Sequence, residues 1–439
     1  MKSIGIELRG AGLLKDFGWV FSGNVVYAAS QWLIVLVLSK LGSPEKLGEY
    51  ALGVAVVTPI LVAANLQIRA LVASDIQDQY SFRHYLKFRA VTLVVAMAIV
   101  VIFVLADKHS WHLRGVILVL GVCQTLEYLA DTYYGRMQKF NRLDRVSRSS
   151  MMKGPLSLLA LALIFYFTRD VFWACLGLLL GRLTIVVFYD ARFHSGPALP
   201  AAAKARDDWD WRPMYHLLLT AWPLGVIALL ASLNGNIPRY FIDAHAGTRS
   251  LGIFAALYSL VAIGTLFINA FGQSVFVPAA TAFAARDVES FRGIVWQFTL
   301  LAGGLGLAAV AVAALFGQWL LAVLYRPEYA NGALLVQLMI VGGVYWVSTA
   351  QGYILTAIRW LKGQIVILGL TVVVAIAACA WMVPSMDLMG AAHALQLAAA
   401  VQWIGSAFLL WRAGSEIARA PASESDLATC PQDCIAAPR

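Results

Sequence analysis

Twelve apolar stretches, most of them about 20 residues long, follow one another along the chain with short polar segments between them. At about 1.5 Å per residue, some 20 residues of helix cross the roughly 30 Å hydrocarbon core of a bilayer. The stretches are continuously apolar, as in AVTLVVAMAIVVIFVLA (residues 90–106), without alternation of period two. They therefore predict membrane-spanning helices and not the strands of a membrane barrel.

The fold class predicted from this pattern is an all-α membrane protein with about 12 transmembrane helices. The predicted spans are residues 17–39, 49–71, 86–106, 114–134, 150–168, 171–190, 214–238, 250–276, 293–316, 332–357, 363–383 and 388–411. Composition agrees, because the chain is 60% hydrophobic and only 13% charged, whereas about 25% of the residues of a soluble domain are charged.

Basic residues predict the orientation. If the N-terminus lies inside, the cytoplasmic segments hold 23 Lys and Arg residues and the outer loops hold 8, while Arg69 and Arg182 lie within spans. Because cytoplasmic loops carry the excess of Lys and Arg, both termini are expected in the cytoplasm. Both in-span arginines have side chains long enough to extend to the cytoplasmic headgroups.

The segment after the fourth span is the most basic and has two interpretations. It is either a topology signal that contacts anionic lipid headgroups or a dedicated ligand site. Its basic residues are Arg136, Lys139, Arg142, Arg145, Arg148 and Lys153. The net charge of +9 follows from the same bias, and nucleic acid is not an expected partner because no soluble domain is present to bind it.

No motif for a metal or cofactor is recognised. Cys123, Cys175 and Cys379 fall in spans, where they act as small apolar residues, and Cys430 and Cys434 lie near the C-terminus without further ligands at zinc spacing. The phosphate-binding pattern GxxxxGK[ST] is absent from the sequence, which argues against ATP hydrolysis.

The chain contains an internal repeat. The second span opens with LGEYA (residues 47–51) and the eighth with LGIFA (residues 251–255), an offset of 204 residues. Since six spans separate the copies, both halves start on the same side, which is typical of a parallel repeat with the substrate between the halves. We expect halves at residues 1–190 and 214–411 around a central cleft, a cytoplasmic linker at 191–213 and a disordered cytoplasmic tail at 412–439.

On these residues the chain resembles the bacterial polysaccharide flippases of the multidrug/oligosaccharidyl-lipid/polysaccharide exporter superfamily. The best match is SLNGNIPRYFIDAHAGTRSLGIFAALYSL (residues 232–260), in which a polar Asn-x-x-Arg stretch and a Gly-containing loop precede Leu-Gly-x-aromatic. Pro238 replaces the acid that the family pattern places before Arg239, and Asp243 lies one turn further on.

The resemblance implies a function in transport and not in catalysis. Such a protein carries lipid-linked oligosaccharide, a polysaccharide repeat unit on a polyprenyl diphosphate, across the bacterial inner membrane by alternating access. The implied surroundings are membrane lipids, and other membrane proteins of polysaccharide assembly are possible partners.

Charged residues at membrane depth are candidates for function, since each costs at least about 2.5 kcal/mol to insert. Glu127 and Asp131 share one face of the fourth span and are candidates for energy coupling; Asp131 alternatively pairs with a nearby basic residue such as Arg136. Arg69 and Arg239 are candidates for binding the anionic headgroup, because arginine grips phosphate through paired N–H donors.

Neutral polar residues gather on corresponding helices of the two halves, namely the first, second, seventh and eighth. Sugar hydroxyls need such donors and acceptors, whereas the alternative is hydrogen bonding between helices. The candidates for binding the glycan are Asn24, Gln31, Asn234, Asn236, Asn269 and Gln273.

Two other functions remain as alternatives. A small-molecule or drug cation antiporter of the same superfamily needs a buried acid, but the first span has none after Asp16. A membrane glycosyltransferase or polymerase needs carboxylates on a sizeable outer loop, whereas the outer acids here are scattered singly.

Overall fold

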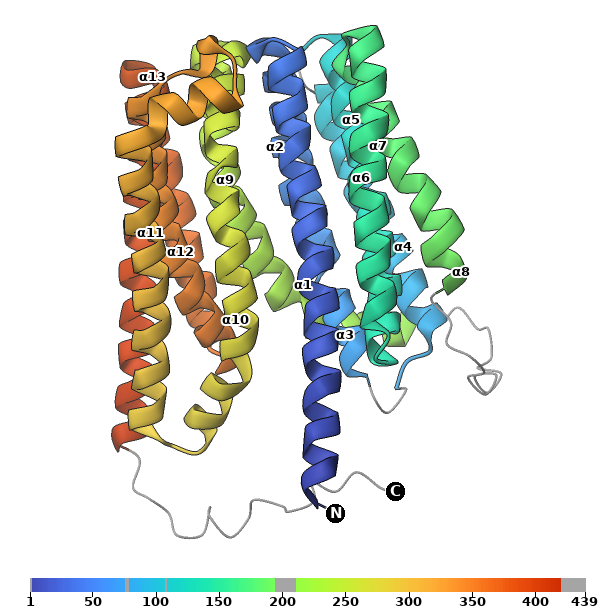
Figure 1. The fold of residues 1–439 in the computed structure, drawn as a ribbon, viewed down its shortest axis with the longest axis vertical. Helices are drawn as coiled ribbons and strands as arrows, with labels where there is room; N and C mark the ends of the chain where they lie inside the picture. Colours follow the sequence, from blue (N-terminus) through green and yellow to red (C-terminus); the bar gives the residue numbers. More distant parts are fainter. Residues whose placement is uncertain (1, 76–78, 107–108, 194–210, 420–439) are drawn as a thin grey trace.

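The computed structural model describes residues 2–75, 79–106, 109–193 and 211–419, and within them the chain is a bundle of long helices without strands (Figure 1). Two groups of helices follow each other along the sequence and lie on opposite sides of the view in Figure 1. The core is continuous between them, because one cluster of buried apolar side chains draws on both groups.

The N-terminal group comprises the helices up to Phe193. Its elements are α1 (Lys2–Leu41), α2 (Pro44–Asn65), α3 (Ile68–Ser74), α4 (Phe82–Ala106), α5 (Trp111–Lys139), α6 (Leu143–Thr168), α7 (Val171–Ile185), the π-helical turn η1 (Val186–Asp190) and α8 (Ala191–Phe193). The C-terminal group comprises α9 (Trp211–Ser259), α10 (Val261–Ala284), α11 (Val288–Leu324), the short 3₁₀ helix η2 (Pro327–Tyr329), α12 (Gly332–Ala357) and α13 (Leu361–Arg419).

Ten helical segments in the described residues are long and apolar enough to cross a membrane. Two of these, Ala221–Ala284 and Leu361–Ala418, have 64 and 58 residues. At about 1.5 Å per residue each is about three times as long as the bilayer core is thick. Each includes a residue with non-helical backbone, Gly247 in α9 and Asp387 in α13. The all-α membrane fold is therefore confirmed, while the number of twelve spans stays a prediction.

The helices run between two ends of the bundle. We call the end with the turn between α1 and α2 the turn end, and the opposite end, with the turn between α5 and α6, the basic end. Helix α1 starts and α13 finishes at the basic end (Figure 1). Helix α13 continues to Arg419, past the predicted start of the tail at residue 412; residues 420–439, with Cys430 and Cys434, lie outside the described residues, as does most of the predicted linker.

The second predicted span, residues 49–71, falls within one segment long and apolar enough to cross a membrane, Pro44–Ser74, but a break divides this segment into two helices. Helix α2 ends at Asn65, and Leu66 and Gln67 both adopt left-handed backbone with φ of 48° and 51° before α3 begins at Ile68. A left-handed residue ends the helical hydrogen-bond ladder and leaves carbonyl groups of the last turn to find other partners. Residue propensity gives no sign of this, since neither side chain favours that conformation.

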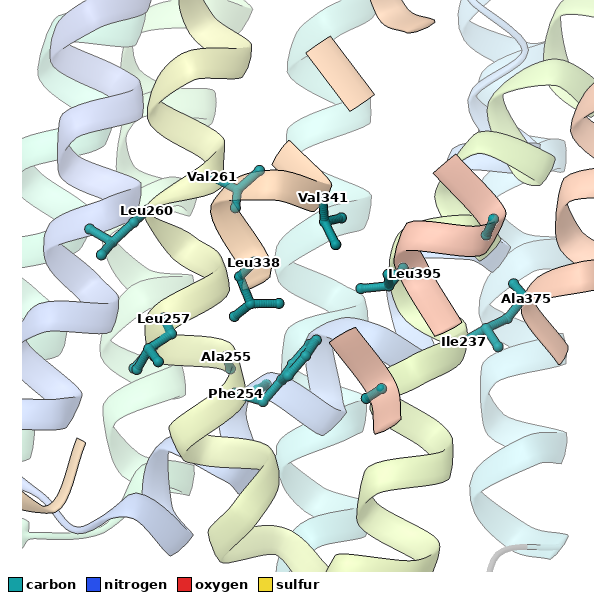
Figure 2. Packing of buried hydrophobic residues seen from close by; sticks show 14 of the residues in the cluster. Ile237, Phe254, Ala255, Leu257, Leu260, Val261, Leu338, Val341, Ala375 and Leu395 are labelled. Atoms are coloured by element: carbon teal, nitrogen blue, oxygen red, sulfur yellow. The ribbon is translucent and has the colours of Figure 1, made fainter. Parts of the chain in front are cut away.

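Small and apolar side chains pack the C-terminal group. Figure 2 shows Ile237 and Phe254 of α9 among Leu338 of α12 and Leu395 of α13, all at most 4% exposed. Helices α11 and α12 come close at Gly306 of the GGLG run (residues 303–306), where an added Cβ would lie 2.7 Å from the Cα of Gly343. Glycine at this crossing allows the backbones to approach, as small residues do in membrane helices.

Candidate functional site

An ion pair between α5 and α6 lies inside the N-terminal group. The Lys153 Nζ is 2.8 Å from Oε1 of Glu127, and the side chains are 1% and 19% exposed. The Lys153 ammonium also donates to the Tyr134 hydroxyl over 2.9 Å and lies 5.5 Å from the ring centre of Tyr27. A cation this deeply buried is tolerated only with a partner of opposite charge, and Glu127 supplies it.

Two further charges complete a group that we call the buried charge cluster: Glu127, Lys153, Arg182 and Asp190. Arg182 of α7 is 6% exposed and donates to the Cys123 carbonyl at 3.3 Å and to Oε1 of Gln31 at 3.2 Å. The Arg182 charge acts on Glu127, and the Asp190 charge acts on Lys153. With two acids and two bases the cluster is electrically balanced, which lowers the cost of burying it.

The cluster retains unused hydrogen-bonding capacity. Oε2 of Glu127, both carboxylate oxygens of Asp190 and Nε of Arg182 make no hydrogen bond of full geometry among the described residues. The Tyr27 hydroxyl lies near Glu127, and the Ser149 and Tyr134 hydroxyls lie near Asp190. Asp190 is fully buried at the end of the π-helical turn η1, and such turns are frequent at functional sites. Buried acceptors without donors are costly, so these carboxylate oxygens are candidates to accept a proton.

The predicted candidates Arg69 and Asp131 contact each other. Nη1 of Arg69 lies 3.4 Å from Oδ1 of Asp131, and Nε lies 3.3 Å from Oε1 of Gln138. The Arg69 and Asp131 side chains are 36% and 22% exposed. Asp131 thus pairs with a nearby basic residue, Arg69, and the arginine that we expected to bind the headgroup shares its charge with an acid.

Arg239 of α9 lies among neutral side chains. Its Nη1 donates to Oδ1 of Asn236 over 3.1 Å, and its guanidinium lies 5.6 Å from the ring centre of Tyr258. No carboxylate among the described residues pairs with it, and its Nε has no hydrogen-bond partner there. Asp243, one turn further on, instead contacts His109 at 3.0 Å.

The glycan-binding candidates do not form one group. Asn234 is fully buried near Arg239, and neither its amide oxygen nor its nitrogen has a partner among the described residues. Asn269 accepts a hydrogen bond from the Tyr353 hydroxyl over 3.2 Å. Gln31 is held by Arg182, whereas Asn24 and Gln273 are exposed.

At the turn end, the two groups cross at the glycines of the internal repeat. A Cβ on Gly48 of α2 would lie 1.9 Å from the carbonyl oxygen of Thr248, and a Cβ on Gly252 would lie 1.8 Å from that of Pro44. Both distances are far below van der Waals contact, so only glycine permits this approach of α2 and α9. The Leu-Gly-x-aromatic-Ala motif thus has a packing role in each copy.

Polar contacts surround the glycine crossing. Arg249 of α9 binds Glu45 of α2 at 2.7 Å and Glu328 at 3.2 Å. Lys40 of α1 donates to the Val323 carbonyl at 2.9 Å, and Arg326 donates to the Gly42 carbonyl at 2.7 Å. The turn ends of the two groups are therefore held together by ion pairs and hydrogen bonds.

A comparison with protein families assigns the chain. The model of a family described as "Polysaccharide biosynthesis protein" matches residues 13–283. The chain belongs to this polysaccharide biosynthesis protein family.

One relative of this chain is the "Capsular polysaccharide biosynthesis protein CapF" of Staphylococcus aureus. The two are 24% identical over 346 residues, which cover 76% of this chain and 83% of the relative.

Among solved structures, the fold is shared with transporters of the MOP superfamily. An inward-facing multidrug resistance MATE family transporter matches with a TM-score of 0.71 at 15% identity, covering 89% of this chain and 96% of its own. An outward-facing structure of such a transporter matches with a TM-score of 0.61 at 15% identity, covering 92% and 96%. Family and fold together favour a membrane transporter over an enzyme.

Three charged residues of this polysaccharide biosynthesis protein were not among the sequence-based candidates. Lys153 belongs to the basic segment after the fourth span, and Asp190 is the last residue of the sixth predicted span. Arg89 also falls in a span, and it is fully buried, with hydrogen bonds to Asn65 O at 3.0 Å and Asn65 Oδ1 at 2.8 Å. It thereby satisfies a carbonyl exposed by the break after α2.

Arg182 is also placed differently from the expectation that it extends to the cytoplasmic headgroups. It is buried and its guanidinium is directed to Gln31 and Cys123. The neutral acceptors on α1 and α5 hold it inside, and no pattern of single residues indicates such a contact between helices.

Proposed function

We propose that this protein carries lipid-linked oligosaccharide, a polysaccharide repeat unit on a polyprenyl diphosphate, across the bacterial inner membrane. The family and the similarity to CapF support a role in polysaccharide biosynthesis, and the fold supports transport. The observation that carries the proposal is Arg239, a cation between the helix groups that no described carboxylate neutralises.

A diphosphate headgroup fits the surroundings of Arg239. Asn236 fixes one edge of the guanidinium, and Nε remains without a partner, so N–H donors are left to bind a phosphate oxygen. Asn234, with both amide atoms unused, is suited to hydrogen-bond a sugar hydroxyl. The adjacent Tyr240 donates to the Ala55 carbonyl of α2, which supports a position between the two groups.

Alternating access would use the turn end as the outer gate. The basic excess supports a cytoplasmic basic end and cytoplasmic termini, so the turn end would face outward, closed by Gly48, Gly252 and the Arg249–Glu45 pair. The higher TM-score to an inward-facing transporter than to an outward-facing one supports an inward-facing state. Opening outward then requires these contacts to separate.

We expect Arg239→Ala to abolish glycan export while the protein still folds and reaches the membrane. Arg239→Lys should restore export only in part, because lysine keeps the charge but lacks the planar fork. Surface glycan is measured in cells that lack the native protein and carry each variant. The matched control is Arg412→Ala, which removes a 61% exposed arginine of α13 and should leave export unchanged.

Full export by Arg239→Ala would overturn the assignment of this residue. Mass spectrometry of lipid bound to the gently purified protein provides an independent test, because the proposal requires a polyprenyl-linked glycan. Recovery of a small organic cation in its place would favour a cation antiporter. This function is the second candidate because multidrug transporters have a similar fold. An Arg239 charge that no carboxylate neutralises would repel a cationic substrate, which argues against a cation carrier.

Energy coupling is proposed to involve Glu127, with Asp131 as the second candidate. The unpartnered Oε2 of Glu127 supports proton uptake at the buried charge cluster. Protonation of Glu127 would weaken its pair with Lys153 and so change the balance of charge between α5 and α6. Asp131 pairs with Arg69, with 3.4 Å between Nη1 and Oδ1.

A further inference from the structure

A row of hydrogen-bonding groups connects the buried charge cluster to the basic end of the bundle. The Lys153 ammonium contacts Glu127 on one side and donates to the Tyr134 hydroxyl, over 2.9 Å, on the other. The Tyr134 hydroxyl in turn lies 2.7 Å from Oγ of Ser149. Both hydroxyls lie near the carboxylate of Asp190. We call these groups, in this order, the relay: Glu127, Lys153, Tyr134, Ser149 and Asp190.

The spacing of residues on α5 and α6 explains why these groups form a row. Tyr134 comes seven residues after Glu127 on α5, which places both on one face of that helix. Ser149 comes four residues before Lys153 on α6, which places this pair on one face as well. Seven residues of helix are about 10 Å long. The relay therefore runs over about this distance from the middle of α5 toward the turn between α5 and α6.

Asp190 completes the relay from a third segment. It is the last residue of the π-helical turn η1, and it is fully buried. The charge that acts on it most strongly is that of Lys153 on α6. Other ionisable groups face it from α5 and from its own turn: Glu127, Tyr133, Tyr134 and Tyr189. The carboxylates of Glu127 and Asp190 thus share the field of one ammonium, and such acids take up protons as a coupled pair.

The relay ends beside a solvent-exposed pocket of about 470 Å³ at the basic end, which Tyr189 and Arg148 help to line. Tyr189 is partly exposed and is the neighbour of Asp190 on η1. Arg148 is exposed and is the neighbour of Ser149 on α6. At the opposite end of the relay, Oε2 of Glu127 is buried. A proton on Glu127 therefore has a row of polar groups on its way to the pocket.

We propose that Asp190 is the group through which Glu127 exchanges its proton with the cytoplasmic side. The inference rests on the coupling role proposed above for Glu127. Hydroxyl groups both donate and accept hydrogen bonds, and acids within membrane spans form proton relays in pumps and transporters. Because contacts between the helix groups close the turn end, the relay leads toward the basic end.

Proton release leaves the groups between the two acids as they were. The Lys153 ammonium gives a proton to the Tyr134 oxygen, and the tyrosine gives its own proton to Ser149. The serine gives its own to the carboxylate of Asp190, and the Lys153 amine takes the proton of Glu127. Glu127 thereby changes from acid to carboxylate and Asp190 from carboxylate to acid. Asp190 then passes the proton to water in the pocket, and proton uptake follows the same route in reverse.

Infrared difference spectroscopy of the purified full-length protein after a rapid fall in pH tests the relay without a transported substrate. The band of protonated Glu127 is identified by its loss in Glu127→Gln. We expect Asp190→Asn to slow the appearance of this band by about tenfold or more, because a positioned proton donor speeds proton transfer by about 100-fold or more. Asp190→Glu should restore the rate, since it keeps the carboxyl group.

Two serines of α6 separate proton transfer from a disturbance of packing. Ser149→Ala removes a hydroxyl of the relay and should slow the Glu127 band as Asp190→Asn does. Ser147→Ala removes a hydroxyl that is also buried, at 2% exposed, but donates to the Leu143 carbonyl over 3.0 Å. Its rate should equal that of the wild type. The control for loss of charge is Glu416→Gln, which neutralises a 53% exposed acid of α13 and should leave the rate unchanged.

An unchanged rate in either Asp190→Asn or Ser149→Ala overturns the proposed route. Equal slowing in Ser147→Ala and Ser149→Ala also overturns it, because the effect would then come from packing of α6. Absence of a Glu127 band in the folded wild type refutes both the relay and the coupling role of Glu127, whereas the headgroup role of Arg239 keeps its separate test. If Asp190→Asn does not fold, the comparison of the two serine variants decides.

Discussion

Lys153 is a cation placed where water scarcely reaches it, and its environment explains why the chain tolerates it. Glu127, the Tyr134 hydroxyl and the Tyr27 ring surround the ammonium within hydrogen-bond or cation–π distance. The pair is balanced only while both members are charged. Removal of one partner leaves the other charge buried and unpaired, which is more costly than removal of both.

We therefore expect Lys153→Met to destabilise the protein by about 3–5 kcal/mol. The double variant Glu127→Gln/Lys153→Met should recover much of this loss, because it leaves neither charge unpaired. Thermal unfolding in detergent, followed by tryptophan fluorescence, measures the effect. The control is Lys362→Met on an exposed site of α13. A loss in the double variant equal to the sum of the losses in Lys153→Met and Glu127→Gln would show that the two residues act independently.

Glu127 also permits a test of energy coupling at the same site. Glu127→Gln mimics the neutral acid, so it should keep substrate binding but lose the dependence of transport on the proton gradient. The measurement is transport into vesicles under imposed pH gradients. Normal transport with unchanged pH dependence in Glu127→Gln would make the residue structural and place coupling elsewhere.

At the scale of elements, two glycines determine how closely the helix groups approach. Gly48 of α2 and Gly252 of α9 lie against carbonyl oxygens of the opposite helix. Not every glycine carries such a constraint: a Cβ on Gly304 of α11 would meet no atom within 4 Å. Glycine is thus indispensable at the crossing of α2 and α9 and replaceable at an open position such as Gly304.

We expect Gly48→Ala to separate the turn ends of α2 and α9 and to lower the free energy of unfolding by about 1–3 kcal/mol or more through overpacking. Gly304→Ala should be neutral or slightly stabilising, because alanine favours helix and the site is open. Melting temperatures of the two variants in the same detergent compare them directly. A Gly48→Ala protein as stable as Gly304→Ala would contradict the described crossing.

The sequence predicts the spans better than the contacts between them. The hydrocarbon core of the bilayer requires continuous apolar stretches, and these are visible in the sequence, so the helices lie where they are expected. The left-handed break at Leu66 and Gln67 is set by tertiary packing around Arg89 and not by local propensity. Similarly, the Arg69–Asp131 and Glu127–Lys153 pairs join residues 62 and 26 positions apart, and a single sequence does not reveal which helices are neighbours.

At the scale of the whole molecule, contacts between the helix groups close the turn end. The N-terminal end of α1 and the C-terminal end of α13 both lie at the opposite, basic end (Figure 1). This arrangement places the beginning and end of the described chain on one side, as an even number of crossings requires. Orientation in the membrane then depends on the basic residues alone.

The expected topology is checked with reporter fusions. Fusions after residues 145 and 205 should report the cytoplasm, and a fusion near residue 246 should report the outside. The physical reason is the excess of Lys and Arg, 23 against 8, in the segments assigned to the cytoplasm. An opposite result at any of the three positions refutes the twelve-span topology.

The glycine crossing also bears on how the chain arose. Gly48 faces Thr248, and Gly252 faces Pro44; both 44 to 248 and 48 to 252 are offsets of 204 residues, that of the internal repeat. Each copy therefore presents the same surface to the other, as identical subunits do in a two-fold symmetric dimer. Glu45 and Arg249 occupy equivalent positions with opposite charges, which identical subunits cannot do. The ion pair is therefore a contact that the two copies of the motif can make only because their sequences differ.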